Sequence, residues 1–179
     1  MKRKLLVILS VIPLLAWAKA GVTNLRVENL HNPLGLDTET PRFSWQLTSD
    51  KRDGHQTAYQ IIVSGDNGEL WNSGKVSSDE QLWIPYQGTQ LKSGTFCTWK
   101  VKVFTNKGET PWTDGGRFST GLLDESKWSG YWIGLERLMP GEERGMHTRM
   151  AARYLRKEFQ LKGKAVKRAT AYVAGIGLD

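Results

Sequence analysis

The sequence has one cysteine, Cys97, and three histidines among its 179 residues. A single cysteine cannot form a disulfide within the chain. No second histidine or cysteine stands at metal-ligand spacing from His55, and His31 and His147 also fall in loop-like segments. We therefore predict that Cys97 is a small buried or half-buried thiol rather than a reactive one, that the protein binds no metal and that it needs no cofactor.

The sequence also lacks an apolar run long enough to span a membrane. The apolar stretch at residues 5–15 is interrupted by a serine and a proline, whereas a spanning helix needs about 20 apolar residues. A cationic start precedes this stretch and small residues follow it, which is the layout of a secretory signal peptide. Residues 1–20 are therefore predicted to be a signal, cut after Ala18 or after Ala20. The mature protein is predicted to be periplasmic or extracellular, with no membrane attachment.

The mature chain, without this signal, has no large excess of positive or negative charge. The full sequence has 25 basic and 18 acidic residues, a net charge of +7. Four basic residues and no acidic residue precede Ala20, so cleavage there leaves 21 basic and 18 acidic residues, a net charge of +3. This balance is ordinary for a soluble protein, and no nucleic-acid partner is predicted.

The spacing of the apolar residues predicts strands rather than helices. Apolar and polar side chains alternate through residues 41–47 and again through residues 98–103. Successive side chains of a strand point to opposite faces, so Trp45 and Trp99 each lie on the apolar face of a half-buried strand. We predict that these two strands face each other across a small sandwich core that contains both tryptophans.

Five further strands complete a predicted β-sandwich over residues 21–122. Their segments alternate in polarity or are rich in β-branched residues, and turn sequences separate them. The segments are residues 22–28, 59–63, 69–72, 81–84 and 117–120, with Pro85 expected to end the fourth. About seven short strands in roughly 100 residues are typical of an immunoglobulin-like or fibronectin type III sandwich.

The sequence changes character after the predicted sandwich. Residues 123–151 are interpreted as a linker followed by an irregular segment with scattered charge. Residues 152–161 and 167–174 alternate again, which predicts two more strands. Two strands alone cannot bury a sheet face. Residues 152–179 are therefore predicted to be the incomplete start of a second, jelly-roll-like β-sandwich, so that the whole chain is all-β.

Tryptophan is abundant, with eight residues. We assign Trp45 and Trp99 to the core, because tryptophan fills the interior of a small sandwich. Both a core position and an exposed, sugar-stacking position remain open for Trp71, Trp83, Trp112, Trp128 and Trp132. We predict that Trp128, Tyr131 and Trp132, next to the domain boundary, form an inter-domain contact, with sugar stacking as the alternative.

Several segments of the sequence carry a family resemblance that covers nearly all of the mature chain. They are residues 32–36 with 41–45, residues 57–63, residues 99–103 with 118–122, residues 128–134, residues 152–159 and residues 171–177. In their order and spacing they resemble the N-terminal part of large multidomain bacterial α-L-rhamnosidases. The sequence departs from that family at Cys97 and Thr98, where an aromatic residue tends to precede the strand tryptophan.

The resemblance implies an exported glycoside hydrolase that removes terminal L-rhamnose from plant polysaccharides or glycosides, with inversion. It also implies that the catalytic carboxylates lie in an (α/α)6 barrel well downstream of the sandwich domains. Inverting glycosidases hold two carboxyl groups about 6.5–9.5 Å apart. Nearly all acidic residues of this chain fall in turns or on polar strand faces. We therefore predict no catalytic residue in it and assign no substrate-binding residue.

Three functions remain open from the sequence. The first is a non-catalytic structural or accessory module of an exported α-L-rhamnosidase, with downstream domains of the same protein and plant glycan as its partners. The second is a free carbohydrate-binding module, in which exposed aromatic residues such as Trp112 or Trp128 bind glycan. The third is a fibronectin-type module that binds other proteins.

Overall fold

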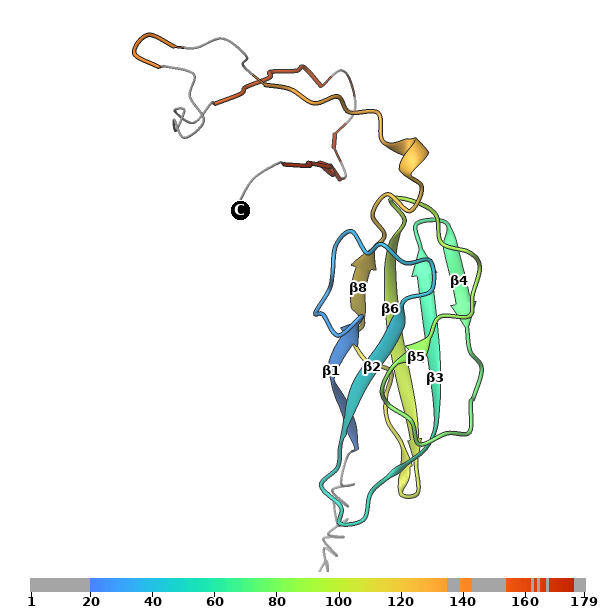
Figure 1. The fold of residues 1–179 in the computed structure, drawn as a ribbon. Helices are drawn as coiled ribbons and strands as arrows, with labels where there is room; N and C mark the ends of the chain where they lie inside the picture. Colours follow the sequence, from blue (N-terminus) through green and yellow to red (C-terminus); the bar gives the residue numbers. More distant parts are fainter. Residues whose placement is uncertain are drawn as a thin grey trace, which may run out of the picture. The chain divides into compact units, whose positions relative to one another are not determined.

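The computed structural model describes residues 20–134, 139–142, 154–161, 163, 165–166 and 168–175. The chain divides into two compact units, Met1–Ser129 and Gly130–Asp179. All strands assigned among the described residues lie in the first unit, and the one helical element among them is a short 3-10 turn, Glu125–Lys127 (Figure 1). The prediction of an all-β chain is confirmed.

The first unit is a sandwich of two antiparallel sheets. Its strands are β1 (Gly21–Val27), β2 (Arg42–Thr48), β3 (Gln56–Gly65), β4 (Gly68–Asn72), β5 (Ile84–Pro85), β6 (Phe96–Thr105), β7 (Gly108–Glu109) and β8 (Gly116–Ser119). One sheet has the order β1-β2-β5, and the other has the order β4-β3-β6-β7. β7 and β8 pair with successive lengths of the same edge of β6.

The core lies between the two sheets, as the alternation of β2 and β6 predicts. Trp45 of β2 and Trp99 of β6 are only 1% and 2% exposed. The ring of Trp99 packs on Phe43 of the opposite sheet, with centroids 4.6 Å apart. The ring of Trp45 packs edge-on against Tyr59 of β3 at 5.2 Å. Both tryptophans therefore bridge the sheets, and their assignment to the core is confirmed.

A buried amide joins β2, β3 and the loop that precedes β5. Gln56 is 2% exposed, and its Oε1 accepts a hydrogen bond from Trp45 Nε1 at 3.0 Å. Its Nε2 donates to the main-chain carbonyls of Ser78 and Glu80 at 3.0 and 2.7 Å. Every polar atom of this side chain is thus paired, as a buried amide requires. The sequence does not single out Gln56, which stands among ordinary polar loop residues.

The prediction for Cys97 is also confirmed. Its side chain is fully buried in the core of the sandwich. Burial raises the pKa of the Cys97 thiol to about 11. The thiol therefore stays protonated at neutral pH and is a poor nucleophile.

One predicted strand is wrong in its position. The sequence predicts a strand over residues 81–84 that ends before Pro85, whereas β5 comprises Ile84 and Pro85 and pairs with β2. Trp83 has a φ of +59°, which interrupts the extended backbone before Ile84. Pro85 is tolerated inside β5 because β5 is the last strand at its edge of the sheet.

The two strands expected after residue 151 are not formed in the described part of the second unit. Residues 154–161 and 168–175 carry no strand. Their large side chains are exposed, with Tyr154 at 98% and Val173 at 87%. A pair of strands is stable only where one face of its sheet is buried, and the large apolar side chains of these residues are exposed instead. The assignment of this region to a second sandwich stays a prediction.

The predicted signal peptide, except for its last residue Ala20, lies outside the described residues. His147 also lies outside them, within the stretch 143–153. Within the described part of the chain, no helix combines the length and the apolar character needed to cross a membrane.

Candidate functional site

The three aromatic residues predicted to contact another domain are exposed. Trp128 is 43% exposed, Tyr131 92% and Trp132 71%. The boundary between the two compact units falls after Ser129, so the three residues belong to different units. Exposed aromatic side chains are suited to a contact, and each of these rings keeps a large area open to solvent. Their role in an inter-domain contact stays a prediction.

The chain leaves the sandwich through a hydrogen-bonded arrangement that we call the exit clamp. It comprises Leu36, residues 92–95 and residues 120–123. Gly121 N donates to Leu36 O at 2.7 Å, and Gly94 N donates to Gly121 O at 3.0 Å. Leu123 N donates to Ser93 Oγ at 2.9 Å. Segments from distant parts of the sequence thus hold the main chain as it leaves β8.

Thr120 is the buried centre of the exit clamp. Its side chain is 2% exposed. The Thr120 hydroxyl accepts a hydrogen bond from Thr95 N at 2.9 Å and donates one to Lys92 O at 2.6 Å. The main-chain N–H of Thr120 donates to Thr95 O at 3.0 Å. Three hydrogen bonds therefore tie this one residue to the loop before β6.

The outer edge of β8 is covered by residues 32–36. Arg117 N donates to Asn32 Oδ1 at 2.8 Å, and Ser119 N donates to Pro33 O at 3.0 Å. Leu36 N donates back to Ser119 O at 2.8 Å. These bonds satisfy main-chain groups that an edge strand would otherwise expose. The strand from which the chain departs is consequently held on both sides, by β6 and by this loop.

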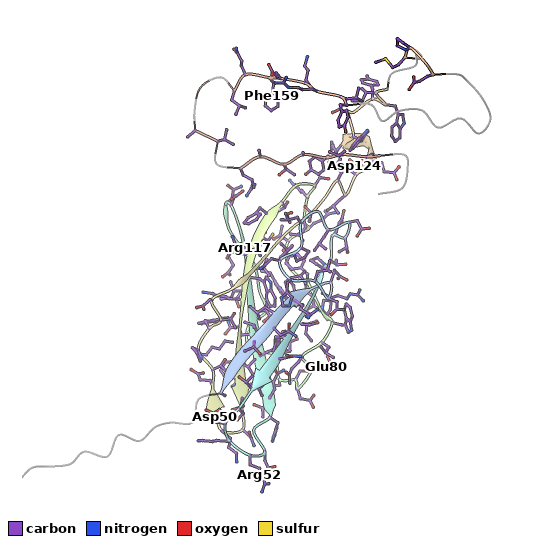
Figure 2. The ribbon with its side chains drawn as sticks, turned by 90° about the vertical axis from the view of Figure 1, so that its left-hand side faces the viewer. Asp50, Arg52, Glu80, Arg117, Asp124 and Phe159 are labelled. Atoms are coloured by element: carbon purple, nitrogen blue, oxygen red, sulfur yellow. The ribbon has the colours of Figure 1, made fainter. Side chains whose placement is uncertain are left out.

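The exit clamp lies at the opposite end of the sandwich from the start of β1. Gly21 pairs with Thr48, so the chain begins its first strand beside the β2–β3 loop. Figure 2 shows Asp50 and Arg52 of that loop at one end and Asp124 at the other. The chain therefore enters the first unit at one end and leaves it at the other.

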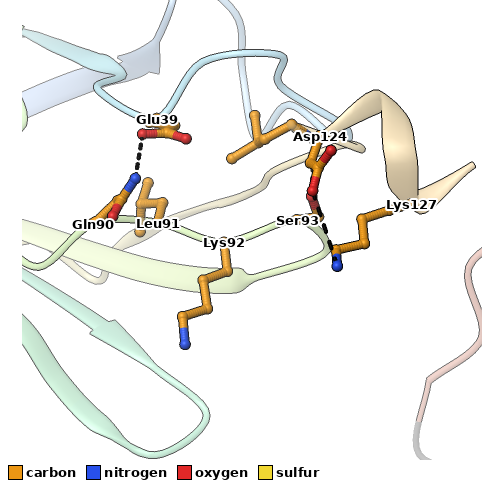
Figure 3. Close-up of a pocket in the computed structure, with 8 residues that line it drawn as sticks. Glu39, Gln90, Leu91, Lys92, Ser93, Asp124 and Lys127 are labelled. Atoms are coloured by element: carbon orange, nitrogen blue, oxygen red, sulfur yellow. Dashed lines mark hydrogen bonds and ion pairs between the residues drawn. The ribbon is translucent and has the colours of Figure 1, made fainter.

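An open pocket of about 480 Å³ lies beside the exit clamp (Figure 3). The residues that line it are Glu39, Gln90, Leu91, Lys92, Ser93, Leu123, Asp124 and Lys127. Gln90 Nε2 donates to Glu39 Oε2 at 2.8 Å, and Lys127 Nζ lies 3.9 Å from Asp124 Oδ2. Much of the polar lining is thus paired within the pocket, as expected of a structural junction.

The carboxyl groups with altered pKa do not resemble a glycosidase acid. Asp124 Oδ1 accepts a hydrogen bond from Ser126 N at 2.9 Å, and hydrogen bonding to Ser126 lowers the pKa of Asp124. Hydrogen bonding to Arg42 likewise lowers the pKa of Glu28. A general acid needs a raised pKa, so both carboxyl groups are shifted in the wrong direction. Within the described residues, no group of three His, Cys, Asp or Glu side chains is placed to hold a metal ion.

The tryptophans that the sequence leaves open divide into two groups. Trp71 and Trp112 are half-buried, whereas Trp83, Trp128 and Trp132 are exposed. Trp71 packs against Phe43 and Tyr86, with centroids 6.0 and 5.4 Å away. The Lys100 ammonium lies 5.0 Å from the centroid of Trp112. Trp71 lies in β4, whereas the other four lie outside any strand, where strand periodicity makes no prediction.

Two antiparallel sheets packed around a core of aromatic and aliphatic side chains define an immunoglobulin-like domain. Residues 22–124 match the family model described as the N-terminal immunoglobulin domain of Rha78A-like proteins. The matched region is more than half of the chain, and the chain belongs to this family.

The relatives are α-L-rhamnosidases, which confirms the resemblance seen in the sequence. An α-L-rhamnosidase of Formosa agariphila is 34% identical over 84% of this chain and 17% of that protein. The crystal structure of Streptomyces avermitilis α-L-rhamnosidase complexed with L-rhamnose matches with a TM-score of 0.61 and 37% identity, over 64% of this chain and 12% of that one. The Dictyoglumus thermophilum α-L-rhamnosidase matches with a TM-score of 0.59 and 39% identity, over 63% and 14%. The chain therefore spans less than a fifth of the length of these relatives.

Proposed function

We propose that this chain is the non-catalytic N-terminal part of an exported α-L-rhamnosidase. The whole protein would hydrolyse terminal L-rhamnose from plant polysaccharides or glycosides. The observation that carries the proposal is the similarity to the Formosa agariphila enzyme, which extends over 84% of the chain and therefore beyond the sandwich. A sandwich used in an unrelated protein would be expected to share the domain but not the sequence on its C-terminal side.

In this proposal the sandwich is a rigid spacer that sets the direction of the chain entering the next domain. The hydrogen bonds of the exit clamp support this role, because they fix the main chain as far as Leu123. The downstream domains of the same protein are the proposed partners, with Trp128, Tyr131 and Trp132 contributing to the contact. The signal-like residues 1–20 support export to the periplasm or the extracellular space.

The direct test of the proposed function is an activity measurement. The 179-residue chain is expected to release no rhamnose from an aryl α-L-rhamnoside, because the carboxyl pair required for glycoside hydrolysis would lie downstream. Protein translated from the same reading frame with its downstream region included is expected to release rhamnose. Release that scales with the concentration of the 179-residue chain alone would contradict a non-catalytic role, and an inactive longer protein would contradict the rhamnosidase assignment.

The rigid-spacer role predicts a specific effect of removing the Thr120 hydroxyl. In Thr120→Val, Thr95 N and Lys92 O lose their buried partner, and we expect the free energy of unfolding to fall by about 1–3 kcal/mol. Urea unfolding measures this loss, and hydrogen exchange should become faster at the amides of Gly121 and Leu123.

The matched control for this substitution is Thr57→Val. The Thr57 hydroxyl donates to Phe104 O at 3.2 Å but is exposed, so water can replace it. We expect a change within about 0.5 kcal/mol for this exposed site. Equal effects of the two substitutions would show that Thr120 has no special part in holding the outgoing chain.

A further inference from the structure

Trp83 combines two properties that rarely occur together. Its side chain is 46% exposed, and its backbone has a φ of +59°. A bulky residue in this left-handed region is strained, and an exposed ring gains little from packing in return. Strain of this kind is retained where the neighbouring structure enforces it, and it clusters at active sites, ligand clamps and switch regions. Trp83 is therefore a candidate for a role outside the core.

Hydrogen bonds to β2 hold the backbone around Trp83 in place. Trp83 N donates to the buried Ser44 Oγ at 3.0 Å. Gln81 accepts twice, at its main-chain O from Trp45 N and at its Oε1 from Leu47 N, both at 3.0 Å. These bonds lie on the N-terminal side of the ring, and the pairing of β5 with β2 lies on its C-terminal side. The ring is thus presented on a rigid support rather than on a mobile loop.

The ring of Trp83 is also held from one side. The Arg42 guanidinium lies 4.3 Å from the ring centroid. Arg42 is itself fixed by Glu28, with Nη2 to Oε2 at 2.7 Å and Nε to Oε1 at 3.1 Å. Among the described residues, β5 is the last strand at its edge of the sheet. Leu82, the residue preceding Trp83, is also exposed, at 65%.

We propose that Trp83, Arg42 and Glu28 form a binding platform for a pyranose ring of a neutral polysaccharide. The flat indole offers an apolar face on which the C–H face of a pyranose can stack. Glu28 compensates the charge of Arg42, so the platform has no net charge with which to select uronates or phosphates. The guanidinium Nη1 is not used in the bonds to Glu28 and can donate to a sugar hydroxyl. The choice of a saccharide over other flat ligands rests on the proposed function.

Tyr154 is the control for this platform. It is another exposed aromatic residue, at 98%, but it lies outside the sandwich. Asparagine adopts a positive φ more readily than most residues, so Trp83→Asn removes the ring without adding strain. Trp83→Phe keeps an aromatic face at the same position and tests whether a ring there is enough for stacking.

The experiment is affinity electrophoresis of the 179-residue chain in native gels. The gels contain soluble β-1,4-galactan, xyloglucan or arabinogalactan as neutral probes, and polygalacturonate or single-stranded DNA as anionic probes. We expect at least one neutral polysaccharide to retard the chain. Trp83→Asn should weaken that binding by about tenfold, the loss expected for one aromatic stacking contact. Trp83→Phe should retain part of the binding, and Tyr154→Asn should bind as the unaltered chain does.

Three results would overturn the proposal. They are the absence of retardation in all three neutral gels, retardation by the anionic probes alone, and equal losses in Trp83→Asn and Tyr154→Asn. If Trp83→Asn melts far below the unaltered chain, Trp83→Phe decides, and unchanged binding by a folded Trp83→Phe then overturns the proposal. None of these results bears on rhamnose release by the longer protein, so the two proposals fail separately.

Discussion

Replacing Trp99 with alanine is expected to remove about 3–5 kcal/mol from the stability of the sandwich. The ring is 2% exposed and packs on Phe43 of the opposite sheet. It also fills the space above Gly116, where an added Cβ would lie 2.5 Å from Trp99 Nε1. Because domains of this size are stable by about 5–15 kcal/mol, the substitution should remove a large fraction of the total.

Thermal unfolding followed by circular dichroism measures this effect. Each kcal/mol lowers the Tm of a domain of this size by about 4–8 °C, so Trp99→Ala should lower it by about 12 °C or more. Trp128→Ala is the control, and we expect it to change the stability by no more than about 0.5 kcal/mol because the ring is exposed. A small loss in Trp99→Ala would mean that the two sheets do not share one core.

Gln56→Glu is expected to have the second large effect, and that effect should depend on pH. The ionised carboxylate that this substitution introduces could still accept from Trp45 Nε1, but it would face the Ser78 and Glu80 carbonyls without a proton to donate. An uncompensated buried charge costs about 3–5 kcal/mol, which is the loss expected at pH 7. Below the unfolded pKa of about 4.3, the protonated group can donate to one carbonyl, and the loss should fall to about 1–3 kcal/mol.

The direction of this pH dependence follows from proton binding. Burial raises the pKa of a carboxyl group, so the folded variant binds more protons than the unfolded chain. Its stability is therefore greatest below the unfolded pKa and declines as the pH rises through the folded pKa. Urea unfolding at pH 4 and pH 7 measures the difference, with the exposed Gln87→Glu as the control. Equal losses at the two pH values would contradict the buried hydrogen bonds of Gln56.

The local sequence predicts which strand side chains face the core of the sandwich. It does not predict the buried hydrogen bonds that join distant segments. The period of two in β2 and β6 assigns Trp45 and Trp99 to the interior without reference to any other segment. The partners of the Gln56 side chain lie 11, 22 and 24 residues away, and those of the Thr120 hydroxyl lie 25 and 28 residues away. A buried polar residue in such a network looks like any surface residue in the sequence, because only the fold shows what encloses it.

At Trp83 the sequence pattern predicts a regular strand that the structure does not contain. Residues 81–84 are largely apolar and bounded by proline, so sequence pattern favours a strand there. The bonds from Trp83 to Ser44 and from β2 to Gln81 select a left-handed conformation at Trp83 instead, and only Ile84 and Pro85 pair. Tertiary contacts thus override the local preference at the one exposed tryptophan that we assign to a binding platform.

The spacer role requires the sandwich to hold its outgoing chain rigidly, and backbone 15N relaxation of the 179-residue chain tests this most directly. The amides of Thr95, Thr120, Gly121 and Leu123 should have order parameters near 0.85, the value of rigid backbone, as should the central residues of β6. Order parameters below about 0.6 from Thr120 onward, with β6 still rigid, would contradict the spacer role. The sandwich would then be joined to the downstream domains by a flexible linker.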